Sequence, residues 1–317
     1  MRSRLFCNVF LLTTLSSFML QTTACNDDIE PLNIIYREVI ENGFTPNGFT
    51  PNGFTPNGFK LNSQTMTGVS LSSVRLDGRE VSGLHLHGSS FNAASATGRT
   101  VSGLDFSGAL ATVNMLPPGA QQAVEYTLRF DRVYVDPQTP GGDIFLYDVS
   151  FARSGDATFS SLCADSKGNP VSAVPILNSW NIQTGERIEN TNLITFACIS
   201  GAIGKCVRLG YRPWAQANSC TNSSCSPVSL ANHHQACTRL IRADYCGNGK
   251  SYTLEGTPIE VYDGLSPQIQ RQTMGWDIEA KWTPKGAQCL SDMRHAELIS
   301  KGHAPDCDGD GKPEVAA

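Results

Sequence analysis

The chain has 317 residues and a hydrophobic content of 40%, which is enough to bury a core in one large domain or two modest ones. Charged residues make up only 17%, whereas 29 glycines and 17 prolines favour short strands and turns over long helices. The net charge of −5 provides no general basic field, so we expect no nucleic-acid partner.

Residues 1–24 have the composition of an export signal. Arg2 and Arg4 form a positively charged start, Leu5 to Leu20 is mostly apolar, and Ala24 puts a small residue before the expected cut. The apolar stretch is short and interrupted by Ser and Thr, and no later segment approaches the roughly 18 apolar residues of a transmembrane helix. We therefore predict that a signal peptide is removed and that the mature protein leaves the cytosol.

Cys25 follows this cut directly, and its position resembles the lipobox of bacterial lipoproteins, in which such a cysteine is acylated. Thr22 stands where the lipobox usually has leucine, so ordinary cleavage remains the alternative. Lipidation implies a membrane partner: an outer-membrane or cell-surface lipoprotein, with residues 25–41 as a tether. Without it the protein would be secreted or periplasmic.

Residues 42–111 repeat a five-residue unit, beginning with copies of NGFTP and diverging from Asn62 onward. Each diverged unit has an apolar fifth residue, and most have glycine second. This period fits neither a helix nor a strand and is typical of a solenoid. The segment resembles the pentapeptide-repeat family, which implies a short right-handed β-helix. Pro46, Pro51 and Pro56 would interrupt its ladder, so a spacer is the alternative; either form would be a stalk.

From Thr112 the pattern changes to alternating or buried apolar runs that predict strands. These runs are residues 123–136, 143–151, 194–198, 251–263 and 275–282. Ser229 is placed to cap a helix that continues through Ile241. We therefore expect residues 112–317 to form a mainly β domain with one or two short helices.

Nine cysteines follow the repeat, and in an exported protein they predict a disulfide framework. They are Cys163, Cys198, Cys206, Cys220, Cys225, Cys237, Cys246, Cys289 and Cys307. Nine is an odd number, so a lipidated Cys25 would leave one free thiol or one intermolecular bond. If Cys25 is not lipidated, it could close a fifth bridge. The connectivity is left open by the sequence.

Two blocks, TFACISGAIGKCVRLGYRPW (195–214) and HQACTRLIRADYCGNGKSYTLEGTPIEVYD (234–263), resemble the bacterial ADYC-domain family. The family is named for the four residues Ala243, Asp244, Tyr245 and Cys246. The resemblance covers the chain from about residue 120 to its end. It implies an envelope or secreted protein and brings no catalytic residues.

The signature also has a physical interpretation as a scaffold. Arg239 and Arg242 could bracket Asp244 in an ion pair, and Tyr245 would bury a ring that has a polar end. A disulfide from Cys237 or Cys246 would pin the end of the helix to the sheet.

One cluster has spacing that could suit zinc: His233, His234 and Cys237, joined by Cys220 and Cys225. In an oxidising compartment these thiols are expected to form disulfides instead, and paired histidines usually lie in solvent.

The tail APDCDGDGKPE is the better metal candidate. Asp306, Asp308, Asp310 and Gly311 match positions 1, 3, 5 and 6 of a calcium loop. Position 12, normally a bidentate glutamate, is Ala317. We therefore expect at most a weak calcium site, with a solvated acidic tail as the alternative and no other cofactor.

The sequence contains neither a Gly-x-Ser-x-Gly elbow nor a His-Glu-x-x-His motif, and no catalytic residue is assigned. The leading hypothesis is a surface-displayed binding or structural module on the repeat stalk, with an unknown ligand. The alternative is an extracellular hydrolase of unrecognised family. Trp180, Tyr211 and Trp214 would suit a glycan if exposed, although we expect them in the core.

Overall fold

The computed structural model describes the chain from residue 67 to 309 with short gaps, together with residues 33–34. The described ranges are 33–34, 67–115, 121–139, 141–165, 167–221, 224–253, 257–272, 277–291, 293–295 and 305–309. The predicted signal peptide, Cys25, the first five repeat units and Asp310 lie outside these residues.

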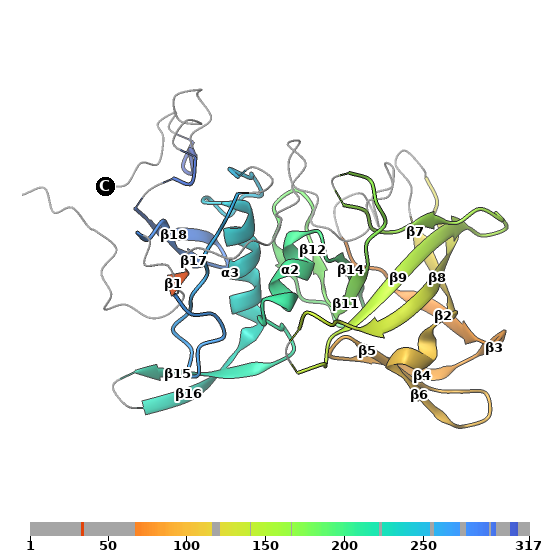
Figure 1. Cartoon of the computed structure of the whole chain (residues 1–317). Coiled ribbons are helices and arrows are strands. Elements are labelled where there is room, and N and C mark those ends of the chain that lie inside the picture. Colours follow the sequence, from red (N-terminus) through yellow and green to blue (C-terminus); the bar gives the residue numbers. More distant parts are fainter. Residues whose placement is uncertain are drawn as a thin grey trace, which may run out of the picture.

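An eight-stranded antiparallel sheet forms one side of the molecule (Figure 1). Its order is β14-β11-β9-β8-β7-β2-β3, with β10 paired to β9. The strands are β2 (Leu71–Leu76), β3 (Arg79–Glu80), β7 (Leu110–Met115), β8 (Val124–Val135), β9 (Phe145–Arg153), β10 (Ser160–Ser161), β11 (Ala173–Leu177) and β14 (Ile194–Cys198). Buried residues alternate along β8, as the period-2 sequence pattern predicts. The core of this side contains seven buried aromatic rings, those of Phe91, Phe106, Tyr126, Phe130, Tyr147, Phe151 and Phe196.

The diverged repeat units of residues 67–111 form antiparallel hairpins and one turn of 3-10 helix (η1, Gly103–Phe106), not a solenoid. Besides β2 and β3, they supply a small sheet of β4 (Ser82–His87), β5 (Ser90–Ala94) and β6 (Thr100–Ser102). The solenoid interpretation is therefore wrong for these residues.

The physical reason lies in glycines such as Gly78 and Gly88, whose positive φ lets the chain reverse between strands where a solenoid would only turn a corner. Asp77 and Gly78, with φ of 52° and 74°, make the two-residue turn between β2 and β3. The prediction that the apolar fifth residue of each unit points into the protein is nevertheless correct. Nearly all of the described fifth residues lie in the core or pack against it. β7 pairs with β2 on one side and β8 on the other, so strands from both sides of residue 111 share one sheet.

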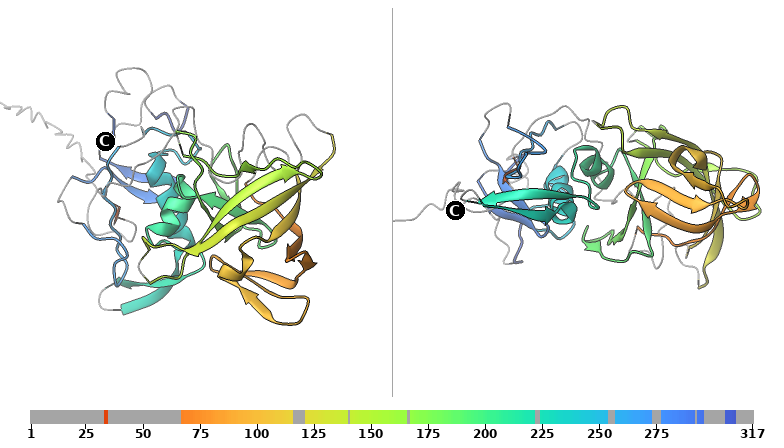
Figure 2. Two further views of the ribbon diagram at one scale, coloured as in Figure 1. Left: turned by 45° about the vertical axis from the view of Figure 1, so that its right-hand side comes forward. Right: turned by 90° about the horizontal axis from the view of Figure 1, so that it is seen from below.

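The other side of the molecule is built around two helices, α2 (Ala202–Arg208) and α3 (Leu230–Arg242). Seen from below, the helices lie between the large sheet and the small sheet that contains β17 and β18 (Figure 2). Small sheets complete this side: β1 (Asn33–Ile34) with β17 (Ala280–Thr283) and β18 (Gly286–Leu290), β12 (Ser179–Trp180) with β13 (Arg187–Ile188), and β15 (Gln216–Thr221) with β16 (Ser224–Ser229). The described chain is thus mainly β with two short helices, as predicted.

Ser229 caps α3 as expected, since its hydroxyl accepts a hydrogen bond from the Ala231 N–H at 3.2 Å. The strand predicted over residues 251–263 is wrong: residues 251–253 and 257–263 have irregular backbone with one isolated bridge. Their alternating apolar residues, Ile259 and Val261, are buried in the helical core without forming a regular strand. No helix among the described residues is long and apolar enough to cross a membrane.

Candidate functional site

The C-terminal end of α3 is buried and turns sharply into the signature residues. Ala243 adopts a left-handed conformation with φ of 49°, and its N–H donates to the Leu240 carbonyl. The next N–H, that of Asp244, donates to the Arg239 carbonyl at 2.9 Å. This is the usual way in which a left-handed residue ends a helix, and it directs the side chain of Asp244 back under the helix.

Asp244 is fully buried and binds both arginines of the last helical turn. Its Oδ2 accepts from Arg239 Nη1 at 2.6 Å and from Arg242 Nη1 at 3.0 Å. The backbone N–H groups of Asn248 and Gly249 also donate to this carboxylate. The predicted ion pair is therefore present. We call Asp244, Arg239 and Arg242 the Asp244 node.

The node combines one negative and two positive charges away from water. Burial lowers the pKa of Arg242 to about 9, and the neighbouring Arg239 acts in the same direction, whereas Asp244 opposes both. Buried charges are tolerated only when they are paired and hydrogen-bonded, so the carboxylate is essential to this arrangement.

The node also joins segments that are distant in the sequence. Arg239 Nε donates to the Pro284 carbonyl in the β17–β18 turn at 3.1 Å, and its Nη1 donates to the Thr184 carbonyl between β12 and β13. Arg242 Nη2 donates to the Gly249 carbonyl. The contact at Gly249 is so close that an added Cβ would lie 1.8 Å from the Gln183 carbonyl oxygen. The helix end is therefore locked to two turns at once.

Tyr245 forms the second buried contact of the signature. Its ring stacks on Trp282 of β17 with centroids 5.3 Å apart, and its hydroxyl donates to Glu279 Oε1 at 2.6 Å. The same hydroxyl accepts from the Arg294 N–H at 2.9 Å, and the Arg294 guanidinium binds Glu279 Oε2. The prediction of a buried ring with a polar end is confirmed.

Among the residues that the structure describes, four disulfides use eight of the nine predicted cysteines. They are Cys163–Cys198, Cys206–Cys237, Cys220–Cys225 and Cys246–Cys307. The side chains of Cys289 and Cys25 lie outside the described residues. Such a framework is typical of an oxidising compartment, extracellular or periplasmic.

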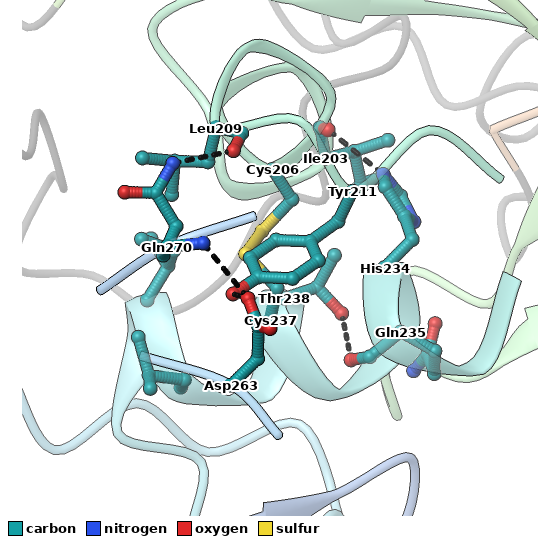
Figure 3. Close-up of a disulfide and its surroundings, with 12 residues drawn as sticks. Ile203, Cys206, Leu209, Tyr211, His234, Gln235, Cys237, Thr238, Asp263 and Gln270 are labelled. Carbon is teal, nitrogen blue, oxygen red and sulfur yellow. Dashed lines mark hydrogen bonds between the residues drawn. A yellow bond between two sulfur atoms is a disulfide. The ribbon is translucent and has the colours of Figure 1, made fainter. Parts of the chain in front are cut away.

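We expected a disulfide from Cys237 or Cys246 to attach the end of α3 to the sheet. This is wrong, because neither cysteine is bonded to a strand. Cys237 is bonded to Cys206 of α2, because α2 and not a strand lies beside α3 at this point (Figure 3). Cys246 is bonded to Cys307 in the C-terminal tail.

A set of buried polar side chains surrounds the Cys206–Cys237 bond (Figure 3). Tyr211 donates its hydroxyl hydrogen to Asp263 Oδ2 at 2.8 Å, and burial raises the pKa of this tyrosine well above its usual value. The Gln270 N–H also donates to Asp263, and its side-chain amide donates to the Leu209 carbonyl. These bonds tie the 263–270 loop to α2.

The zinc interpretation does not fit this geometry. Cys220, Cys225 and Cys237 are all in disulfides, which agrees with the compartment argument. His233 and His234, however, are buried, so the expectation that they lie in solvent is wrong. They belong to α3, which is enclosed on most sides. His234 Nε2 lies 3.0 Å from the Ile203 carbonyl, and His233 stacks on Tyr211.

The buried His234 predicts a loss of stability in acid. Burial lowers its pKa to about 4 from an unfolded value of 6.5, so the unfolded chain binds the proton more tightly. Its contribution is fully present above pH 6.5 and is lost as the pH falls through about 4, by about 3 kcal/mol in the free energy of unfolding. Urea unfolding of His234→Gln across this range should show a flatter pH dependence than the wild type. Replacing the exposed His85 by Gln should leave the slope unchanged; equal slopes in His234→Gln and the wild type would contradict the assignment.

The C-terminal acidic residues are only partly described. Asp306 and Asp308 flank the bridged Cys307, and Asp306 Oδ1 accepts from the Gly309 N–H at 2.7 Å, whereas Asp310 lies outside the described residues. Within the described ranges there is no group of three or more His, Cys, Asp or Glu placed to hold a metal ion. Calcium binding at this tail stays a prediction.

The sequence interpretation missed the distant partners of the signature, above all Glu279, Arg294 and the turn at Thr184. Each lies 34 or more residues away from the residue that it contacts, which is Tyr245 for Glu279 and Arg294 and Arg239 for Thr184, and no local pattern marks it. Of the three aromatic residues considered for a glycan, Trp180 and Tyr211 are in the core, and Trp214 is 37% exposed.

Comparison with models of protein families gives a match. The family model described as ADYC domain matches residues 99–296, which include both helices and the whole Asp244 node. Neither the curated proteins nor the solved structures yielded a match.

Proposed function

The chain belongs to the ADYC domain family, and from this premise we propose that it is an exported cell-envelope or secreted protein that acts as a binding or structural module. The observation that carries the proposal is that the signature residues bind other segments of the same chain. Asp244 accepts hydrogen bonds from two arginines and two backbone amides, and the Tyr245 hydroxyl is held between Glu279 and Arg294. These groups hold chain segments together, which supports a scaffold role for the residues that define the family.

The attachment of the repeat segment changes how such a module would be displayed. Asn33 and Ile34 pair with β17, and the Thr67 N–H donates to the Trp180 carbonyl. The described residues on either side of the segment 35–66 are therefore held by the folded body, which argues against a free-standing stalk. If Cys25 is acylated, only residues 25–32 separate the lipid from β1. Eight extended residues reach at most about 28 Å, so the β1–β17–β18 sheet would lie close to the membrane.

The test is the intact mass of the protein taken from its native envelope without reduction, before and after alkylation of free thiols. Because the four disulfides use the other eight cysteines, an acylated Cys25 should be accompanied by one alkylated residue, Cys289. No lipid and no alkylation would instead indicate a Cys25–Cys289 bridge and a released protein. Recovery in the cytosolic fraction with reduced thiols would refute export altogether.

A further inference from the structure

The β15–β16 hairpin has one face that packs on the protein and one that faces solvent. The strand register pairs Gln216 with Ser229 and Asn218 with Pro227, so these four side chains share a face, and all four are exposed. The residues of the opposite face include Ala217 and Val228, which pack against the helical core. The hairpin extends from the body at the lower edge of Figure 1.

Trp214 lies two residues before the start of β15. It is one of four large apolar residues that are notably exposed among the described residues. Its indole is held by the turn between β4 and β5: a Cβ added at Gly88 would lie 3.2 Å from Trp214 Nε1. The ring is therefore positioned at one edge by the protein while much of its surface stays open to solvent.

The hairpin is also free of charge. The sequence from Pro213 to Thr238 contains no Asp, Glu, Lys or Arg, and Arg212 just before it is paired with Asp143. Within the described part of the chain, no other protein group hydrogen-bonds the side-chain amides of Gln216 and Asn218. The hairpin itself therefore offers no charged group to a ligand, whereas its amides and hydroxyl offer donors and acceptors to a neutral ligand rich in hydroxyls.

We propose that Trp214, Gln216, Asn218, Pro227 and Ser229 form a binding surface for an uncharged polysaccharide. This inference deepens the proposed function by naming the ligand class. Sugar rings present C–H groups that pack on the face of an indole, whose π-system is electron-rich, and hydroxyls that bond side-chain amides. Six residues of β15 extend over about 20 Å, which is long enough for several sugar rings in a row. The neutral surface matches a neutral polymer and disfavours nucleic acids and acidic polymers.

The experiment is native gel electrophoresis of the purified exported protein through gels that contain hydroxyethylcellulose, galactomannan or dextran. The wild type should be retarded by at least one of these neutral polymers. Trp214→Ala should weaken binding about tenfold or more, because a large aromatic side chain often carries much of the energy of a contact. The double variant Gln216→Ala/Asn218→Ala should weaken it by a smaller factor.

The matched control is Leu104→Ala, which removes another exposed apolar side chain, in η1 and outside the hairpin, and should bind as the wild type does. Each variant is first shown to unfold at the wild-type temperature. The proposal is overturned if none of the three polymers retards the wild type, if Trp214→Ala binds equally well, or if the protein binds neutral phosphatidylcholine vesicles through Trp214 instead. None of these outcomes touches the proposed function, whose test is the mass and location of the protein.

Discussion

Replacing Asp244 by asparagine is expected to lower the free energy of unfolding by about 3 to 5 kcal/mol, although the side chain keeps its shape. The change removes the only negative charge of the Asp244 node and leaves Arg239 and Arg242 buried beside each other. Without that carboxylate the two buried guanidinium groups repel each other in a low dielectric and cannot recover their hydration. Arg239 also locks the helix end to the turns at Thr184 and Pro284, so these contacts should loosen when Asp244 is replaced.

The measurement is urea unfolding at neutral pH without reductant, so that the disulfides stay closed in every variant. Glu189→Gln is the matched control, because Glu189 also pairs with an arginine, Arg187 at 2.9 Å, but is 79% exposed. Exposed pairs contribute between zero and about 1 kcal/mol, so this variant should unfold almost as the wild type does. If Asp244→Asn loses no more than Glu189→Gln, the node is not a main support of the fold.

The parts of the fold and site that the sequence predicts correctly are those encoded over short distances. The ion pair of Asp244 with Arg239 and Arg242 follows from residues within one helix end, and Ser229 marks the start of that helix. In the repeat, the period of five identifies buried positions such as Phe91, Val101 and Phe106, because apolar side chains enter the core in either fold.

The choice between a solenoid and hairpins depends on the backbone, which the apolar period does not specify. Glycine can adopt positive φ in many kinds of turn, and here Gly78 and Gly88 reverse the chain. The partners of Tyr245 were equally hidden, because Glu279 and Arg294 come from segments that the fold alone brings to α3. The pairing of nine cysteines was open for the same reason.

The disulfides should differ in how much they contribute to the free energy of unfolding, according to the length of the loop that each one closes. Replacing both Cys206 and Cys237 by alanine is expected to lower the free energy of unfolding by about 4 kcal/mol, since their separation of 31 residues restricts the unfolded chain strongly. Both sulfurs are fully buried between α2 and α3, so the cavity left behind adds to the loss. The comparison is the Cys220→Ala/Cys225→Ala variant, whose bridge spans only five residues at the tip of an exposed hairpin and should contribute about 2 kcal/mol. Urea unfolding of both double variants under oxidising conditions tests this order. A larger loss from the hairpin bridge would mean that the hairpin, and not the contact between the two helices, limits the stability of the domain.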